Sequence, residues 1–349
     1  MPRRFARFLP CGPSASGAGS LTPRVGLGCF SSVGRSLETA LQRVETAERL
    51  GYESVFVTHL AARDSLTTLM AYAARTDRVR LGTGVMPIYS RNPVTTAMSA
   101  VTVDEFSDGR LMLGLGVSHR PVVEGWYGDS IGKPVREMRE YVAIVRAILA
   151  GEEPPDGERF RSGFRLAGVE ARADLPMYVA ALSPGMLRAA GEIADGVILW
   201  TCVPEYIHDV VVPEVSEGRR RAGRELEGFD IVAAVPAAVT GDVAEAREKL
   251  RQDLIPYFSL PFYRAMIERA GFGEEITGSP AGMAEGDPVA ATAAISERYL
   301  GSLAAIGETE QAAESVQRYV AAGTTSPCIG PVPKTDFEAT LEALAGAGP

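Results

Sequence analysis

Residues 78–128 decide the fold: RVRLGTGVMPIYSRNPVTTAMSAVTVDEFSDGRLMLGLGVSHRPVVEGWYG. This stretch predicts a strand, a helix and a second strand. The two strands are the mostly apolar runs Arg78 to Met86 and Leu111 to Ser118. Asn92-Pro93 starts the helix, because proline fits the first helical turn, where its missing N–H needs no partner. Two apolar strands joined by one helix form a parallel crossover unit.

The same alternation of strand and helix continues along the chain. Eight strands are predicted, at 24–30, 54–60, 78–86, 111–118, 176–182, 196–200, 229–240 and 326–332. Eight strands that alternate with eight or more helices predict a (β/α)8 TIM barrel rather than a doubly wound sheet. A dinucleotide-binding sheet requires G-x-G-x-x-G after its first strand, whereas Gly26-Leu27-Gly28 lacks the third glycine and lies inside the strand.

Two segments depart from this alternation. Residues 256–307 are too long for an ordinary loop, so we expect a rim or lid insertion between strands seven and eight. Residues 1–22 combine arginines with a Gly- and Ser-rich run, and their apolar stretch is too short for a signal peptide. We expect a flexible leader there, or a start codon upstream of the true one. A single barrel domain then covers 23–349.

Charge and composition exclude several classes of partner. The net charge of -9 argues against nucleic acid and anionic membrane surfaces. No apolar run approaches the roughly 20 residues that a membrane helix needs. The four cysteines lack metal-binding spacing, which predicts reduced, buried thiols in a cytoplasmic protein and no metal site.

In a barrel of this kind, the functional residues lie at the C-terminal ends of the strands. His59 and His119 follow two of these strands and are the candidate catalytic residues, because an imidazole titrates near neutral pH. Alternatively, each imidazole ring has only a structural role and makes hydrogen bonds within the protein at the barrel rim. The candidate residues for a substrate pocket are Arg63, Trp126, Tyr127 and Trp200, although loop packing explains Trp126 and Tyr127 equally well.

Three long segments resemble one known family, the bacterial luciferase-like flavin and deazaflavin oxidoreductases. They are LGTGVMPIYSRNPVTTAMSAVTVDEFSDGRLMLGLGVSHR, MYVAALSPGMLRAAGEIADGVIL and TTSPCIGPVPKTDFEATLEALA. The resemblance covers about Arg24 to Leu344. The GVSH and VEGWYG motifs are more similar to members that use coenzyme F420, a deazaflavin that carries a hydride. Members that use FMN share most of the same frame.

The resemblance also implies a cofactor site. In the family, a non-proline cis peptide lies beneath the cofactor ring, and the matching pair here is Gly84-Val85. The ribityl and phosphate part would be bound by two strand ends, which match Val117, Ser118 and His119, and Ala180, Ala181, Leu182 and Ser183. Backbone N–H groups at the helix that starts after Ser183 would suit a phosphate.

Three positions differ from the deazaflavin-dependent dehydrogenases that oxidise sugar phosphates or alcohols. Those relatives carry an Asp-His pair where this chain has Thr58-His59. They carry Trp where it has Arg63, and Glu near the position of His119. We therefore expect the cofactor frame to be kept while the substrate chemistry differs.

Three functions remain open. The first is a coenzyme F420-dependent oxidoreductase, acting as a reductase on a small molecule or peptide, in which His59 or a water that it orients supplies the proton. The second is an FMN-dependent monooxygenase of a two-component system. The third is a flavin-binding barrel without turnover. A homodimer is expected by analogy with the family.

Overall fold

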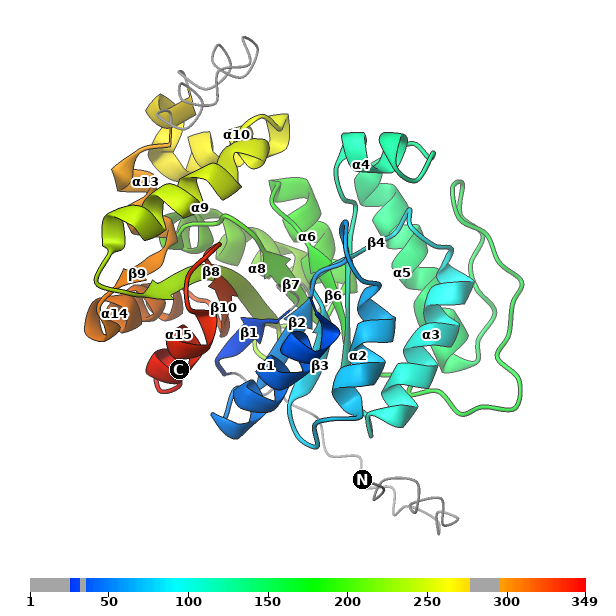
Figure 1. Ribbon diagram of the computed structural model, residues 1–349. Helices are drawn as coiled ribbons and strands as arrows, with labels where there is room; N and C mark the ends of the chain where they lie inside the picture. Colours follow the sequence, from blue (N-terminus) through cyan, green and yellow to red (C-terminus); the bar gives the residue numbers. More distant parts are fainter. Residues whose placement is uncertain (1–25, 32–35, 277–294) are drawn as a thin grey trace, which may run out of the picture.

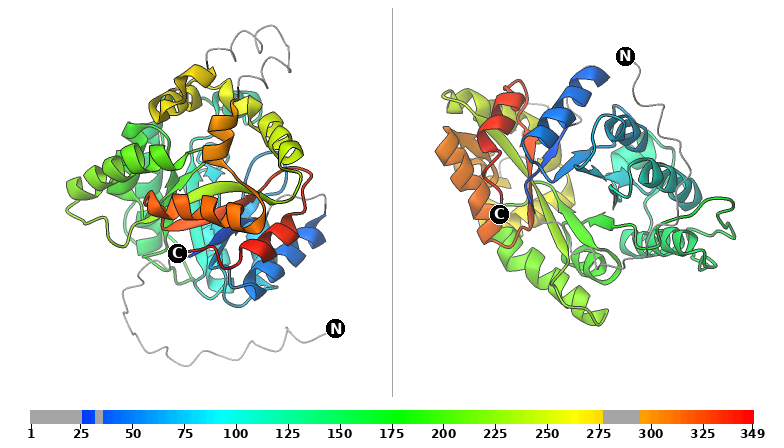
Figure 2. Two further views of the ribbon diagram at one scale, coloured as in Figure 1. Left: turned by 90° about the vertical axis from the view of Figure 1, so that its left-hand side faces the viewer. Right: turned by 90° about the horizontal axis from the view of Figure 1, so that it is seen from below.

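The computed structural model describes residues 26–31, 36–276 and 295–349. The predicted leader at 1–22 and residues 277–294 of the predicted insertion lie outside these ranges. The described residues form a closed barrel of parallel strands with helices around its outside, as the side view and the view from below show (Figures 1 and 2). This arrangement confirms the (β/α)8 fold.

Eight strands make the barrel, and all eight lie where the sequence predicts them. They pair in chain order, and the pairing of β10 with both β8 and β1 closes the ring. The eight are β1 (Gly28–Phe30), β2 (Ser54–Val57), β3 (Arg80–Thr83), β5 (Leu111–Gly116), β6 (Met177–Ala180), β7 (Gly196–Leu199), β8 (Asp230–Val239) and β10 (Ser326–Pro331). Two short strands are added to it, β4 (Met86–Pro87) beside β5 and β9 (Ala305–Gly307) beside β8.

Helices follow most strands and pack against their outer faces. They are α1 (Leu37–Arg49), α2 (Ser65–Ala73), α3 (Pro93–Phe106), α4 (Arg120–Gly125), α5 (Pro134–Ala150), α6 (Pro184–Ile193), α7 (Pro204–Tyr206), η1 (Ile207–Val211), α8 (Val212–Arg221), α9 (Val243–Phe258), α10 (Pro261–Ile267), η2 (Glu268–Phe272), η3 (Gly273–Ile276), α13 (Glu297–Leu303), α14 (Thr309–Ala321) and α15 (Phe337–Leu344). Side-chain caps fix several starts. Asp64 accepts a 2.8 Å hydrogen bond from Thr67 N, and Asn92 accepts one of 2.8 Å from Thr95 N.

Side chains alternate between two apolar layers along each strand, as the period of a strand requires. One layer fills the barrel and includes Phe30, Phe56, Met112 and Tyr178. The other lies between the strands and the helices and includes their neighbours in the chain, such as Val55. The inner layer makes the barrel a packed core rather than a pore.

A buried polar network closes the N-terminal end of the barrel. Asp230 is 2% exposed, and its carboxylate accepts hydrogen bonds from Tyr178 (2.8 Å), Thr325 (2.6 Å) and Ser326 (2.7 Å). Arg80 donates a longer bond of 3.4 Å to the Tyr178 hydroxyl. Because a buried carboxylate without partners is costly, these donors allow Asp230 to lie inside the protein.

The segment between β8 and β10 differs from the prediction in one respect. Helix α13 ends at Leu303, and Ala305 begins strand β9, which is not among the predicted strands. β8 is ten residues long and extends beyond its neighbours, so its last residues need another hydrogen-bonding partner, which β9 supplies. Helix α4 was not predicted. In the described ranges, no helix is long and apolar enough to cross a membrane.

Candidate functional site

The C-terminal end of the barrel, here called the mouth, carries a bulge between β3 and β5. Gly82 pairs with Met112, and the next pair along is Met86 with Leu115. The chain therefore advances four residues on one side and three on the other, which places one extra residue in the first strand. Thr83 bridges the gap, because its hydroxyl donates to Gly114 O at 2.7 Å and accepts from Gly114 N at 2.8 Å.

The Gly84–Val85 peptide bond lies within this bulge and is cis, which confirms the geometry that the family resemblance implies. A Cβ on Gly84 would lie 2.7 Å from the Phe30 ring, and one on Gly116 would lie 2.5 Å from Val85 Cγ2. Neither contact is possible for a real side chain. The two glycines therefore let the bulge settle against β1 and β5, and they leave Val85 partly exposed at the mouth beside Ala180.

Two residues in the left-handed backbone region follow strands at the mouth. Ser118 has φ 57° after β5, and Thr201 has φ 59° after β7. A threonine in this region is unusual because its side chain branches at Cβ. The Tyr299 hydroxyl donates a 2.9 Å hydrogen bond to Thr201 O, and the Thr201 hydroxyl donates one of 2.6 Å to Trp200 O. Such strained residues are often found at functional sites.

His119 is packed among aromatic rings from α9 and α10. Its ring stacks on Phe262, with centroids 5.5 Å apart, and meets Tyr263 edge-on at 5.8 Å and Tyr257 at 6.2 Å. Trp200 joins the group through Tyr257, at 5.6 Å. We call these five rings the ring cluster. It links the ends of β5 and β7 to the segment that follows β8.

Two polar atoms of the ring cluster are buried and make no hydrogen bond in the described structure, Nδ1 of His119 and Nε1 of Trp200. The Trp200 indole lies close to the Tyr257 phenol and acts to lower the pKa of that phenol. The geometry between Trp200 Nε1 and the Tyr257 hydroxyl is nevertheless not that of a hydrogen bond. Burial lowers the pKa of His119 and raises the pKa of Tyr257. Both side chains are therefore uncharged near neutral pH, and two polar atoms buried without a partner are unusual in a folded protein.

His59 follows β2 and contacts the start of α2. Its Nδ1 is 3.3 Å from Ser65 N, 3.2 Å from Ser65 Oγ and 3.6 Å from a carboxylate oxygen of Asp64. The same Asp64 oxygen is paired with Arg91. Burial lowers the pKa of His59, with Asp64 acting in the opposite direction and Arg91 in the same direction as burial.

The predicted residues after β6 lie at the start of α6. Ser183 caps this helix by accepting a 3.4 Å hydrogen bond from Met186 N, and Leu182 O accepts one of 2.6 Å from the Tyr206 hydroxyl. The side chain of Ala181 is buried in the outer layer, so this residue presents its backbone. Space is open around Gly185, where an added Cβ would meet no atom within 4 Å. The first N–H groups of α6 therefore suit an anion.

The candidate cofactor residues fit a flavin-like group in two respects. Val85 and Ala180 are partly exposed at the mouth and have short side chains, as a flat ring requires, and Gly116 is buried behind Val85. The start of α6 follows Ala180 by four residues and offers backbone donors for a phosphate. Val117, Ser118 and His119 come from the neighbouring strand end, after β5.

The structure places the remaining predicted pocket residues at the mouth side of the fold. Tyr127 follows α4, its hydroxyl is buried without a hydrogen-bond partner among the described residues, and burial raises its pKa. Trp126 is 57% exposed and makes no ring contact with the cluster in the described structure. Arg63 lies in the β2–α2 connection, where its charge acts on the Tyr72 hydroxyl.

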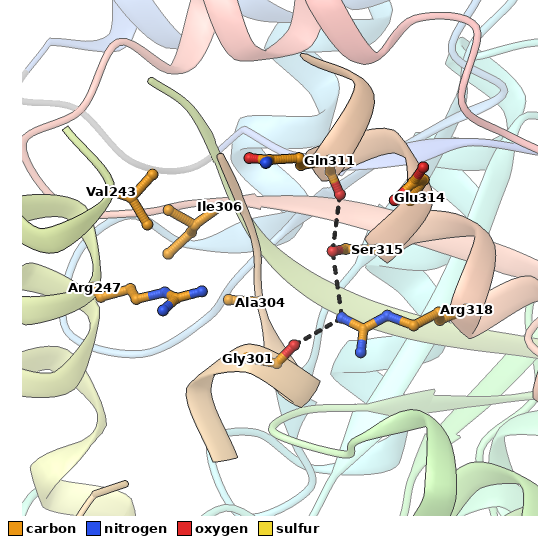
Figure 3. Close-up of a pocket in the computed structure, with 9 residues that line it drawn as sticks. All are labelled: Val243, Arg247, Gly301, Ala304, Ile306, Gln311, Glu314, Ser315 and Arg318. Carbon is orange, nitrogen blue, oxygen red and sulfur yellow. Dashed lines mark hydrogen bonds between the residues drawn. The ribbon is translucent and has the colours of Figure 1, made fainter. Parts of the chain in front are cut away.

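A hollow of about 630 Å³ lies elsewhere, between α9, α13, β9 and α14 (Figure 3). Arg247 and Arg318 extend into it from opposite sides, over Ala304 and Ile306. Arg318 donates to Gly301 O at 2.7 Å and to Ser315 Oγ at 3.3 Å, and Arg247 is paired with Glu297 at 2.8 Å. None of the predicted site residues lines this hollow, and both guanidinium groups already have protein partners.

Several residues at the mouth were not predicted as functional. Asp64 and Arg91 were not among the predicted site residues. Three rings of the cluster lie inside residues 256–307, the segment interpreted as an insertion: those of Tyr257, Phe262 and Tyr263. Their spacing in the sequence carries no signal of a shared site, because they meet His119 only after the barrel closes.

Comparison with known proteins agrees with this geometry. Residues 11–326 match the family of luciferase-like monooxygenases. A Mycobacterium tuberculosis protein, whose name assigns it to the coenzyme F420-dependent oxidoreductases, is 30% identical over 304 residues, which is 81% of this chain and 87% of that protein.

Solved structures show the same fold at lower identity. The coenzyme F420-dependent tetrahydromethanopterin reductase of Methanopyrus kandleri has a TM-score of 0.76 at 23% identity, over 93% of this chain and 98% of its own. The FMN-bound oxygenating component of a Pseudomonas putida Baeyer-Villiger monooxygenase has a TM-score of 0.66 at 16% identity, over 93% and 97%. With its barrel, its cis peptide at the mouth and a match over most of its length, this chain belongs to the luciferase-like monooxygenase family and is an enzyme.

Proposed function

We propose that this enzyme is a coenzyme F420-dependent oxidoreductase that works as a reductase on a small organic substrate. The observation that carries the proposal is the cis Gly84–Val85 bulge, which packs on Gly116 and leaves the short side chains of Val85 and Ala180 partly exposed at the mouth. A flat ring needs such a surface. The family relative named for coenzyme F420 supports the deazaflavin over FMN.

Different described residues would bind different parts of the cofactor. Val85 and Ala180 would lie under the ring, and the first N–H groups of α6 after Ser183 would bind a phosphate. When bound, the deazaflavin supplies hydride chemistry, whereas the protein supplies position and electrostatics. The ring cluster would exclude water above this surface, because its rings are apolar and its histidine is uncharged.

FMN would meet the same surface, and a structural neighbour is described with FMN bound. A monooxygenase is therefore the competing function. The two differ in what they do with molecular oxygen, since a deazaflavin exchanges hydride and does not activate oxygen readily. Cofactor choice consequently decides between the functions more directly than any substrate screen.

The test is a pair of titrations on purified protein, one with reduced F420 and one with reduced FMN, followed by calorimetry or fluorescence. We expect saturable binding of reduced F420 and weaker binding of FMN. Arg247→Gln, in the outer hollow, serves as a control that leaves both affinities unchanged. Tight binding of FMN alone, with oxygen from air entering a product, would overturn the proposal in favour of the monooxygenase.

A further inference from the structure

Nδ1 of His59 is a hydrogen-bond acceptor in this fold. Ser65 N lies 3.3 Å from Nδ1 and points its hydrogen at that atom. A backbone N–H can only donate, so Nδ1 carries no proton, and the single proton of a neutral imidazole must be on Nε2. The Ser65 hydroxyl, at 3.2 Å from Nδ1, can donate to the same atom.

The charges around His59 do not reverse this assignment. Asp64 and Arg91 are the charged groups that act on the ring. Asp64 lies 3.6 Å from Nδ1 and would attract a second proton, but Arg91 takes the nearer carboxylate oxygen. The other oxygen accepts 2.8 Å bonds from the backbone N–H and the hydroxyl of Thr67. The carboxylate is therefore occupied by other donors.

Ser65 is the first residue of α2, so its N–H belongs to the positive end of the helix dipole. A helix N-terminus disfavours a cation beside it. This effect and burial act in the same direction on His59, and Arg91 adds to both. A histidine held neutral in this way is known as an electrophilic hydrogen-bond donor in other enzymes.

We propose that Ser65 and Arg91, against the opposing charge of Asp64, hold His59 as a neutral ring with its proton on Nε2, and that His59 acts on the substrate as an uncharged hydrogen-bond donor. This inference rests on the proposed function for its catalytic meaning. Ser65 and Arg91 are positioning residues, because they act through His59, whereas Asp64 opposes them by raising the pKa of His59.

The consequence concerns the source of the proton in a reduction. A neutral Nε2–H stabilises negative charge that develops on the oxygen or nitrogen of an acceptor, in the manner of an oxyanion donor. It does not bring a spare proton with it. Of the two sources considered from the sequence, His59 or a water that it orients, the structure thus favours the water.

The state of the ring can be read directly, because the chain has only three histidines. We suggest labelling histidine with ¹⁵N and recording ring spectra of the cofactor-free protein at pH 7.5, with His59→Gln to assign the His59 signals. We expect the pattern of a neutral ring protonated on Nε2. A ring that is protonated on Nδ1, or charged at this pH, would overturn the inference.

Two variants at Ser65 separate its backbone from its side chain. Ser65→Pro removes the N–H at the first helical position, where proline is tolerated, and the extended backbone of Asp64 (φ -61°, ψ 129°) suits a following proline. Ser65→Ala keeps the N–H and removes the hydroxyl. We expect Ser65→Pro to shift His59 towards protonation on Nδ1, while Ser65→Ala keeps the wild-type pattern. Equal spectra for the two variants would contradict the role of the N–H.

Two charge variants keep the test decisive if Ser65→Pro fails to fold. Arg91→Gln should raise the pKa of His59, because it removes a charge that lowers it. Asp64→Asn should lower the pKa and still cap α2, because asparagine caps helices as well as aspartate does. An unchanged His59 titration in both would overturn the inference. Since these spectra need no cofactor, their failure is distinct from a failed F420 titration.

Discussion

The Val85 side chain occupies the space in which Gly116 would carry a Cβ, with Val85 Cγ2 only 2.5 Å from that position. This contact joins the cis peptide to the end of β5. A side chain on Gly116 must push Val85 and the bulge away, and Val85 belongs to the surface that we assign to the cofactor ring.

Gly116→Ala tests this relationship. Overpacking of a well-packed site costs about 1–3 kcal/mol, so we expect lower stability in urea unfolding and a weaker affinity for reduced F420. Gly301→Ala in α13 is the matched control, because an added Cβ there meets no atom within 4 Å. It should be neutral or gain up to about 1 kcal/mol. Equal behaviour of the two variants would show that the contact has no consequence.

The pH dependence of stability should report His119. Its pKa is lowered in the folded protein, whereas the unfolded ring titrates near about 6.5. Below that pH the unfolded state binds a proton at His119 that the folded state does not bind. The contribution of His119 to the free energy of unfolding is therefore present above the unfolded-state pKa, and it is lost as the pH falls towards the folded-state pKa. His59 contributes with the same sign.

His119→Phe keeps a ring that can stack on Phe262 and removes the titration. We expect its unfolding midpoint in urea to fall less between pH 7.5 and pH 5.5 than that of the wild type. His208→Gln is the control, because His208 lies on an exposed face, 2.7 Å from Asp209. If the unfolding midpoints of His119→Phe and His208→Gln fall equally between pH 7.5 and pH 5.5, burial of His119 has no effect on the pH dependence.

The two tryptophans allow the site to be located by fluorescence. Trp200 belongs to the ring cluster, whereas Trp126 is 57% exposed. In Trp126→Phe all tryptophan emission comes from Trp200, and we expect F420 to quench it strongly. In Trp200→Phe the quenching should be weaker at the same saturation. The opposite ranking would move the cofactor from the cluster towards α4.

A buried ion pair fastens the loop that precedes β6. Arg172 donates to both carboxylate oxygens of Asp104 on α3, at 2.9 and 2.7 Å, and Asp104 is 6% exposed. Arg172→Met leaves that carboxylate uncompensated, so a loss of about 3 kcal/mol is expected in urea unfolding. Glu245→Gln breaks the exposed pair with Lys249 and should cost less than about 1 kcal/mol. Similar losses in the two variants would argue against an effect of burial.

Local chemistry explains why so much of the fold could be predicted. Apolar runs of strand length located all eight barrel strands, and Asn92-Pro93 set the start of α3. The pair Gly84-Val85 was identified through the family resemblance rather than from residue chemistry. Strand β9 was not predicted, because it forms by pairing with the end of the long strand β8. That pairing is a tertiary contact, which the residues of β9 alone do not indicate.

The surroundings of the histidines could not be predicted for a related reason. Arg91 reaches Asp64 across 27 positions of sequence, and Phe262 reaches His119 only after the chain has passed around most of the barrel. Nothing in the residue types near His59 distinguishes a charged ring from a neutral one. The direction of a single backbone N–H, that of Ser65, makes this distinction. The homodimer, the cytoplasmic location and the roles of the individual site residues stay predictions.

The polar network around Asp230 closes the N-terminal end of the barrel, and the packed inner layer fills the space between that end and the mouth. With that end sealed by Tyr178, Thr325 and Ser326, a molecule resting on Val85 can arrive and depart only through the mouth. If the cofactor lies on Val85 as we propose, we expect it to bind before the substrate and to exchange only after the product has left, an order that competition kinetics would reveal.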